Sequence, residues 1–460
     1  MNLPYLTSEF PGIGGVIKQR PEDFFVQELP LYEPSGEGEH VYVEVQKIGL
    51  TTFETVHRLS KALRLHEKDI GYAGLKDARA ITRQIFSILG TTEQAAMNLR
   101  IPGITVQWAA RHGNKLRLGH LWGNRFAIKV RDVMPTDVLK LRPILSIIEK
   151  RGMPNYFGEQ RFGRRGNNDR LGAALIRNDN VSLLKQLLGE PDPAIDDADS
   201  LRARTAFDAR DNETAMKFFP RHCGMERRIL ARLMKTRKPN AAVRAIDEKL
   251  RKLWISALQS RVFNEVVARR ISAIDRLIDG DLAYLHENGA CFQVESVETE
   301  QPRCDAFEIS ATGPLVGYRM TPPKGEALAI ENDVLAKDGL SPASFRTSDY
   351  GRIKGARRPI RVKSKDIELV GGGDEFGPYI TVAFSLPAGS YATVLMGELM
   401  KVESESLAAS AAGGDEGADA QNDEDAAQDS HEGLAGDGDA VDGGLGQADG
   451  QSPAGGEETD

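Results

Sequence analysis

The chain has 460 residues, of which 40% are hydrophobic and 27% charged, the composition of an ordinary soluble protein large enough for two domains. Its formal net charge of -8 is unevenly distributed, because no Lys or Arg follows Lys401 and residues 403–460 contain 17 Asp and Glu. Residues 1–401 therefore hold 67 - 17 = 50 acids against 59 bases, a net charge of +9. A basic body with an acidic tail suits a polyanionic partner, although so modest a charge is common in proteins that bind none.

The three cysteines are Cys223, Cys291 and Cys304, an odd number without a C-x-x-C pair. This pattern argues against a disulfide framework and against a zinc site, and we expect buried free thiols in a reducing cytoplasm. The first residues lack the basic start and apolar run of a signal peptide. No apolar stretch is long enough to span a bilayer, so we expect a cytoplasmic protein without a membrane segment.

The N-terminal part is predicted to form strands and a helix. Residues 41–45 and 126–130 alternate apolar with polar side chains, as in strands with one buried face. Thr51-x-x-Glu54 is a capping box, and apolar residues follow it at helical spacing as far as Leu63. The glycine-rich segment 71–77 that comes next is predicted to be a loop or a short strand.

Longer helical patterns occupy residues 150–350, and the clearest is an apolar stripe over 247–270. Residues 380–386 alternate again as a strand, and Ser390 is a plausible N-cap for a helix over 391–400. The glycines of 370–374 indicate a flexible turn. The simplest arrangement is a sheet-based domain made from both ends of the chain, with a second domain inserted between them.

Several kinds of site have no visible motif in this sequence. The eight histidines are scattered without paired-ligand spacing, and there is no Walker A sequence, no G-x-G-x-x-G that opens a helix and no G-x-S-x-G elbow. We therefore predict neither a metal nor a cofactor.

Four segments combine aromatic, basic and carboxylate residues. Taken singly each has a structural interpretation: Lys76-Asp77 as a solvated turn pair, Gly123-Asn124 as a hairpin turn, and the phenylalanines as core. The segments are Lys18-Gln-Arg-Pro-Glu-Asp-Phe24-Phe25-Val-Gln-Glu28, Gly71-Tyr-Ala-Gly-Leu-Lys-Asp77 with its continuation to Gln84, His120-Leu-Trp-Gly-Asn-Arg-Phe126, and Asn155-Tyr-Phe-Gly-Glu-Gln-Arg-Phe-Gly163.

These four segments, in this order, resemble the signature stretches of the TruD family of tRNA pseudouridine synthases. So do Ala257-Leu-Gln-Ser-Arg-Val-Phe-Asn264, Gly313-Pro-Leu-Val-Gly317 and Leu386-Pro-Ala-Gly-Ser-Tyr391. The resemblance covers nearly all of residues 15–400 and leaves the tail without a counterpart. Six or seven such stretches in the right order make a chance match very improbable.

The resemblance implies a role for six residues. Asp77 matches the catalytic aspartate, Lys18 the cation that pairs with it, and Phe24 an aromatic that lines the pocket. Asn124 and Phe126 match groups that contact and stack on the target base. Tyr391 falls where bacterial members commonly have Phe, so a hydroxyl is added to the aromatic face there.

The implied fold is α+β, a pseudouridine synthase catalytic domain with a mixed antiparallel sheet and an inserted α/β domain special to the family. We place the catalytic domain at 1–152 and 356–401 and the inserted domain at 153–355. Residues 402–460 have almost no large apolar side chain, and we expect a disordered acidic tail. A solvating tail is the simpler interpretation, and competition with RNA for the basic body is the alternative.

Pseudouridine formation cuts the N1–C1′ bond of uridine, turns the base and rejoins it through C5, an isomerisation that needs no cofactor. A flipped base can regain about 1–3 kcal/mol by stacking on an aromatic side chain. Asp77 must be ionised, and a cation such as Lys18 favours that form. We favour Lys18 over Lys76 because the side chain next to Asp77 in an extended segment points to the opposite face. Whether Asp77 attacks the base, attacks C1′ or removes a sugar proton is left open.

Contacts with RNA phosphates require basic side chains. Residues 352–365 hold seven bases and no acid, and another basic cluster follows residue 160. We predict that these two groups contact the RNA backbone, and a third group between Arg227 and Lys238 is interpreted as a solvated face. The predicted contacts are Arg161, Arg164, Arg165, Arg357, Arg358 and Arg361.

The sequence thus predicts an enzyme that isomerises a uridine of tRNA, and the family implies the uridine at position 13. The alternative from another class is a catalytically silent RNA-binding or RNA-folding protein on the same scaffold. A methyltransferase is disfavoured because no glycine-rich cofactor loop is recognisable. We favour a monomer, and RNAs other than tRNA stay open as substrates.

Overall fold

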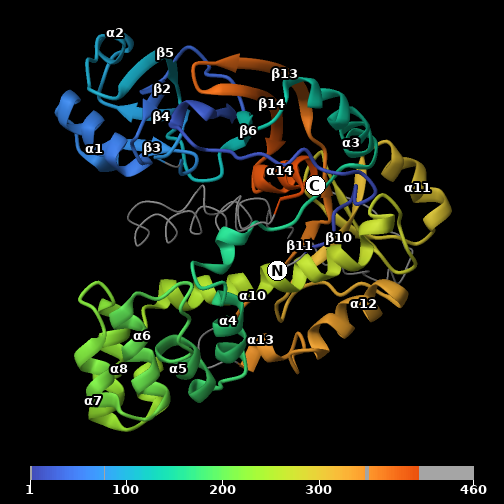
Figure 1. Ribbon diagram of the computed structural model, residues 1–460. Coiled ribbons are helices and arrows are strands. Elements are labelled where there is room, and N and C mark those ends of the chain that lie inside the picture. Colours follow the sequence, from blue (N-terminus) through green and yellow to red (C-terminus); the bar gives the residue numbers. More distant parts are fainter. Residues whose placement is uncertain (1–2, 77, 348–351, 403–460) are drawn as a thin grey trace, which may run out of the picture.

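The computed structural model describes residues 3–76, 78–347 and 352–402. Within these residues the chain forms two lobes arranged as a crescent, one built around a large sheet and the other a bundle of helices (Figure 1). A small sheet and two helices lie where the lobes meet, namely α11 (Val297–Asp305) and α12 (Gly325–Ala336).

The large sheet has eight strands in the order β13-β14-β6-β1-β4-β2-β5, with β3 paired to β4. Strands β1 and β4 are parallel, whereas β1–β6, β6–β14 and β2–β4 are antiparallel. Two strands come from the C-terminal part of the chain, so the predicted α+β fold with a mixed sheet made from both ends is confirmed. The strands are β1 (Phe24–Pro30), β2 (His40–Ile48), β3 (Ile70–Tyr72), β4 (Ile81–Leu89), β5 (Ile104–His112), β6 (Leu121–Arg131), β13 (Lys365–Asp374) and β14 (Gly377–Pro387).

The helices of this lobe are α1 (Thr52–Leu63), α2 (Glu93–Met97), α3 (Val138–Arg151) and α14 (Ala392–Met400). The predicted capping box of α1 is present. The amide of Glu54 donates to the Thr51 hydroxyl at 3.2 Å, and the Glu54 carboxylate accepts from the Thr51 amide at 2.8 Å. The two predicted strands of this lobe lie within β2 and β6, so all three early predictions are confirmed.

Two predictions near the C-terminus are wrong. The residue that caps α14 is Tyr391 rather than Ser390, and it makes no side-chain capping bond. Residues 370–374 are not a turn but the end of β13, where Gly371 pairs with Ile380. The glycines are needed for close approach, because a Cβ on Gly371 would lie 2.7 Å from the carbonyl oxygen of Pro135.

The inserted segment supplies the helical lobe, which encloses a core of its own. The predicted helix over 247–270 is confirmed as the longest of these helices, and its midportion is buried. The helices are α4 (Asn168–Ile176), α5 (Asn180–Leu188), α6 (Ala198–Asp208), α7 (Asn212–Phe218), α8 (Gly224–Thr236), α9 (Pro239–Val243), α10 (Glu248–Arg270) and α13 (Ser344–Thr347).

The small sheet at the joint has the order β11-β10-β8-β9, and β12 pairs separately with β7. Its apolar side chains belong to the same core as those of β6, β14 and α14. Strand β11 pairs with β10, although the sequence pattern assigns residues 356–359 to the catalytic domain. The predicted domain boundaries therefore stay a prediction. These strands are β7 (Met153–Pro154), β8 (Leu282–Leu285), β9 (Cys291–Gln293), β10 (Ile309–Leu315), β11 (Ala356–Pro359) and β12 (Arg361–Val362).

The three cysteines are free, as predicted, but their burial differs. Cys304 is buried, Cys223 is half-buried and Cys291 is exposed, so the expectation of buried thiols is right for Cys304 alone. In the part of the chain that the structure describes, no helix is both long and apolar enough to cross a membrane.

Candidate active site on the large sheet

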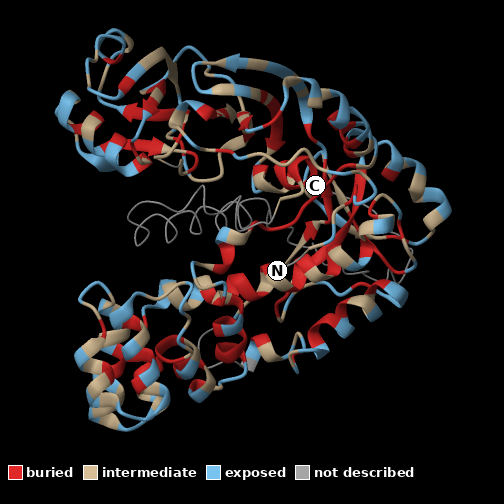
Figure 2. Ribbon diagram, viewed as in Figure 1, coloured by how far each residue is buried: buried red, intermediate tan, exposed pale blue. Residues whose placement is uncertain are grey.

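One face of the large sheet holds a row of buried polar side chains. Apolar cores lie on either side of the row, one between β2, β4 and α1 and the other between β6, β14, α3 and α14. The row consists of Lys47, Thr82, Gln84 and Glu28, none of them more than 2% exposed. Lys47 is registered with Thr82, and Glu28 with Asn124, so all five side chains share one face. Figure 2 shows how deeply these strands are buried.

The sequence contains a signal for this row that our prediction missed. In β2 the buried valines at 41, 43 and 45 are followed at the next inward position by Lys47. In β1, Phe24 and Val26 are followed in the same way by Glu28. A charged side chain at an inward strand position is costly unless it is paired, so such breaks in the alternation indicate a site.

Three groups of Lys76, the residue before Asp77, are held by buried side chains of the sheet and of α1. Its ammonium lies 3.1 Å from the Glu28 carboxylate, in a pair almost fully buried. Its amide donates to the Thr52 hydroxyl at 2.9 Å, and its carbonyl accepts from the Lys47 ammonium at 3.5 Å. Buried charge-assisted contacts of this kind hold a backbone segment in one place.

Gln84 also helps to hold the segment that precedes Asp77. Its amide donates to the carbonyl of Gly74 at 2.6 Å, and its carbonyl oxygen accepts from Thr52 at 3.1 Å. Since Thr52 also binds the amide of Lys76, residues 74–76 are tied to the first turn of α1 and to β4. The segment that leads to Asp77 is therefore rigidly positioned over the sheet.

Asp77 itself lies outside the described residues. The nearby prediction that Lys18, and not Lys76, is its cation is also untested. The structure shows where the two ammonium groups lie: that of Lys76 is paired with Glu28, and that of Lys18 lies 4.3 Å from the centre of the Phe24 ring. Lys18 has a φ of 57°, a left-handed conformation that costs a non-glycine residue about 1 kcal/mol or more.

Phe24 and Phe126 come together as the family resemblance implies. Their ring centres are 6.4 Å apart in an edge-to-face arrangement, and both rings are largely buried. Phe384 of β14 stacks on Phe126 with centres 5.3 Å apart, a contact that the sequence analysis did not anticipate. Aromatic pairs of this geometry add about 0.5–1.5 kcal/mol each and fix the rings in place.

Asn124 stands two residues before Phe126 in β6, and therefore on the same face of the sheet. Its side-chain oxygen Oδ1 is buried without a hydrogen-bond donor among the residues that the structure describes. Leaving such an acceptor unsatisfied costs about 1–3 kcal/mol. An unsatisfied buried amide oxygen beside paired aromatic rings is a ready acceptor for a ligand.

Tyr391 lies at a different aromatic contact. Its ring meets Phe157 edge-to-face, with centres 5.9 Å apart, and a Cβ on Gly158 would lie 2.8 Å from it. Phe157 is fixed in turn by Asn264, whose amide binds its backbone at 2.8 and 3.0 Å. No contact of Tyr391 with Phe24 or Phe126 occurs among the described residues, and its predicted role stays a prediction.

The fold uses the guanidinium groups of Arg357, Arg358 and Arg361 internally, and their contact with RNA stays a prediction that this burial does not support. Arg357 forms a buried ion pair with Glu331 at 2.7 Å. Arg358 is 3% exposed and donates to Asn155 at 2.6 Å, and burial lowers its pKa to about 10. Arg361 is 1% exposed and donates to the carbonyls of residues 151 and 304 at 2.7 and 2.5 Å.

The arginines after residue 160 behave differently from one another. Arg161 is buried and donates to the hydroxyls of Ser256 and Ser260 at 2.7 and 3.3 Å, and its RNA contact stays a prediction that this burial does not support. Arg165 is paired with Asp196 and is mostly covered. Arg164 is exposed and donates to a backbone carbonyl at 3.0 Å. For Arg164 and Arg165 an RNA contact stays a prediction.

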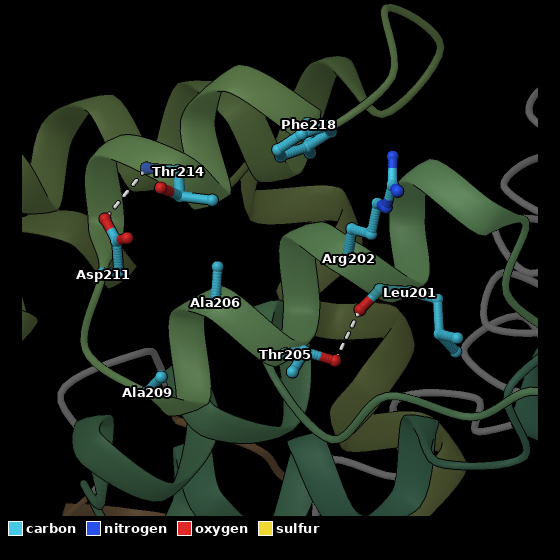
Figure 3. A pocket seen from close by; sticks show the side chains of 8 residues that line it. All are labelled: Leu201, Arg202, Thr205, Ala206, Ala209, Asp211, Thr214 and Phe218. Atoms are coloured by element: carbon cyan, nitrogen blue, oxygen red, sulfur yellow. Dashed lines mark hydrogen bonds between the residues drawn. The ribbon is translucent and has the colours of Figure 1, made fainter.

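A shallow hollow in the helical lobe offers no competing site. It lies between α6 and α7, and two of the polar groups that line it are bound locally (Figure 3). Thr205 donates to the carbonyl of Leu201 at 2.8 Å, and Asp211 accepts from the amide of Thr214 at 3.0 Å. Within residues 3–76, 78–347 and 352–402 no cluster of His, Cys, Asp or Glu could hold a metal ion.

Comparisons with known proteins agree on one family. The family model described as tRNA pseudouridine synthase D (TruD) matches residues 1–399. The tRNA pseudouridine synthase D of Geotalea daltonii is 46% identical over 401 residues, covering 86% of this chain and 99% of the relative. That of Thermus thermophilus is 37% identical over 403 residues, covering 87% and 92%. A crystal structure from Methanosarcina mazei, described as a tRNA pseudouridine synthase D (TruD), superposes with a TM-score of 0.80 at 30% identity, covering 88% and 97%.

Proposed function

Because the chain belongs to the TruD family, and is therefore a pseudouridine synthase and an isomerase, we propose that it converts the uridine at position 13 of tRNA to pseudouridine with Asp77 as the catalytic carboxylate. Family membership over residues 1–399 is the observation that supports the activity. The substrate and its position come from what the family implies. The role of Asp77 is supported by the buried contacts that hold the preceding residue, Lys76, in place.

The fixed position of Lys76 favours Asp77 as the reacting group. A catalytic carboxylate has to be held close to its target, and a displacement of 1 Å can cost a hundredfold in rate. Two bonds from buried groups restrain the backbone of residue 76, and an ion pair holds its side chain. The sheet thus provides the support that a catalytic group at residue 77 requires.

The side-chain oxygen of Asn124, which has no hydrogen-bond donor among the described residues, supports recognition of uracil. Uracil presents an N–H donor between two carbonyl acceptors, and an amide can bind both a donor and an acceptor of that edge. The buried Oδ1 of Asn124 lacks a donor among the described residues, which the N–H of a flipped uracil would supply. The ring of Phe126, two residues along the same strand, is held in place by stacking on the fully buried Phe384.

The proposal is tested with Asp77→Asn, which keeps the shape of the side chain and removes its charge. We expect pseudouridine formation to fall by at least about a hundredfold, with the affinity for tRNA unchanged. Tritium release from tRNA labelled at C5 of uridine measures the reaction, and filter binding measures the affinity. Asp69→Asn, which changes a carboxylate in the preceding 3-10 helix, is the matched control and should stay active.

Three outcomes would contradict parts of this proposal. Full activity of Asp77→Asn would reject Asp77 as the catalytic group. A wild-type protein that binds tRNA and forms no pseudouridine would instead favour the silent RNA-binding alternative. A tRNA with cytidine at position 13 tests the site, since continued product formation would place the target elsewhere.

A further inference from the structure

One short segment of the helical lobe is strongly basic. Residues 214–246 contain nine Lys and Arg and a single acid, Glu226, so their net charge is 9 - 1 = +8. The net charge of residues 1–401 is +9, as 59 bases exceed 50 acids. The segment spans the end of α7, α8 and α9, in the helical lobe. This basic segment lies at one end of the crescent (Figure 1).

The charges of α8 form an exposed stripe. Arg228, Arg232 and Lys235 follow one another at helical spacing, and all three are exposed. The opposite face of the helix is apolar, with Ile229 and Leu230 fully buried. The stripe is continued at both ends by Arg221, Arg237 and Lys238, also exposed.

These six side chains make no ion pair with any residue in the described part of the chain. The acid of the segment, Glu226, lies 3.9 Å from Arg204, which points into the core of the lobe. Arg227 differs from its neighbours, because it donates to the carbonyls of Met216 and Phe219 at 2.9 and 2.6 Å and helps to hold the lobe together.

An uncompensated stripe of this kind is unfavourable for the isolated protein. Like charges four residues apart on a helix destabilise it by about 0.2–0.5 kcal/mol per pair. Glutamine forms helices about as well as arginine or lysine, so the fold alone does not require cations there. A stripe of cations that face outward without acids is the electrostatic form of a surface for a polyanion.

We propose that the exposed stripe of α8, flanked by Arg221, Arg237 and Lys238, is a docking surface for the phosphate backbone of tRNA. This inference rests on the proposed function, which makes tRNA the substrate. The stripe lies in the helical lobe and the candidate active site on the sheet of the other lobe (Figure 1). A folded tRNA is large enough to touch both lobes, so the stripe binds the body of the substrate while the target base enters the sheet lobe.

The test uses the full chain with Arg228→Gln and Arg232→Gln together, and tRNA binding is measured over a range of salt concentrations. Each lost phosphate contact reduces the slope of log K against log salt by about 0.7–0.9, so the double variant should lose about 1.4–1.8. The dissociation constant at physiological salt should rise roughly tenfold. The KM for tRNA should rise with it, and kcat should not change, because α8 does not touch the reacting uridine.

The matched control is Arg142→Gln with Lys150→Gln, two exposed cations of α3 that likewise form no ion pair among the described residues. This variant loses the same charge from another helix and should keep the wild-type slope within about 0.5. Arg228→Lys with Arg232→Lys keeps the charge and should restore the slope. Thermal unfolding of all variants checks that each is folded.

Three outcomes would overturn the docking surface. An unchanged slope in the Gln variant means that the stripe does not meet phosphates, and an equal loss in the α3 control means that net charge alone is responsible. A higher tRNA affinity in the Gln variant would identify residues 403–460, with 17 acids, as the occupant of the stripe. A wild-type protein that makes no pseudouridine would reject the proposed function instead, while the binding slopes would still decide the surface.

Discussion

Two basic segments of this chain look alike in sequence, but some of their arginines differ in burial. Residues 352–365 contain seven Lys and Arg without an acid, and residues 214–246 contain nine with one acid. In the first segment Arg358 and Arg361 are at most 3% exposed. In the second, Arg228 and Arg232 are exposed on the surface of α8. A run of cations therefore does not by itself indicate a surface.

The difference lies in partners that are distant in the sequence. The groups that receive the arginines of the first segment come from elsewhere in the chain: the carboxylate of Glu331, the amide of Asn155 and the carbonyl of Cys304. Each of these contacts links residues 357–361 to another part of the region where the two lobes meet. The exposed cations of α8 form no ion pair in the described part of the chain, and the apolar residues of the helix occupy the other face. The helical spacing of the cations in a segment thus indicates their exposure better than the charge of the segment does.

The contrast between buried and exposed arginines predicts its largest effect for the variant Arg361→Gln. The change leaves the carbonyls of Arg151 and Cys304 without their donors in a buried site. We expect a loss of about 3–5 kcal/mol in the free energy of unfolding, the range for breaking a buried charged network. Urea unfolding, followed by circular dichroism, measures it.

Arg232→Gln is the matched control for that experiment, since the same substitution is made on the exposed stripe. Its free energy of unfolding should stay within about 0.5 kcal/mol of the wild type. If the two variants lost equal stability, the contrast between the buried and the exposed segment would have no energetic basis.

A second test isolates the buried pair of Arg357 and Glu331, whose side chains are 5% and 6% exposed. Burial raises the pKa of Glu331, and the guanidinium partly opposes that shift. Arg357→Met and Glu331→Gln, alone and combined, form a double-mutant cycle. We expect a coupling free energy of about 2–3 kcal/mol, because either single change leaves a buried group unpaired.

The control cycle uses Arg125 and Glu368, which lie 3.0 Å apart on the surface of the large sheet. These side chains are 32% and 63% exposed, so water screens their attraction. Their coupling should stay below about 1 kcal/mol. If the coupling of Arg357 with Glu331 were no larger than that of Arg125 with Glu368, burial would add nothing to the strength of the arginine contacts.

The sequence predicts those features of the fold that depend on neighbours along the chain. The alternation of 41–45 and the capping box at Thr51 give β2 and α1 correctly, because both signals are complete within one element. The strand over 370–374 was missed because Gly371 fits against Pro135, a residue far away in the sequence. The burial of Arg358 and Arg361 was missed for the same reason.

The candidate site shows the same limit. The resemblance to the TruD family leads to Phe24, Asn124 and Phe126, and the structure places all three on one face of the sheet. The supporting row was not predicted, because Lys47 and Gln84 become neighbours only through the strand register. A search for charged residues at inward positions would have found Lys47, but not the backbone groups of residues 74–76 that it and Gln84 support.

The smallest expected effect concerns His286, which reports on the interior around Arg361. Its ring lies 2.8 Å from the Ser310 hydroxyl and packs against Phe307. Burial, and then the charge of Arg361, lowers its pKa from 6.5 to about 4. The unfolded chain therefore binds this proton first as the pH falls. The contribution to stability is complete above pH 6.5 and is lost as the pH falls towards 4.

Because His286 is only half-buried, we discount this loss to about 1–2 kcal/mol. Urea unfolding from pH 7 to pH 4 measures it in the wild type and in His286→Gln, which keeps a polar partner for Ser310. Carboxylates titrate in both proteins, so the difference between the two curves isolates the histidine. The wild type should lose more stability than the variant across this window. Parallel curves would mean that His286 is as well hydrated as in the unfolded chain, and that the interior around Arg361 is more open to water than its burial indicates.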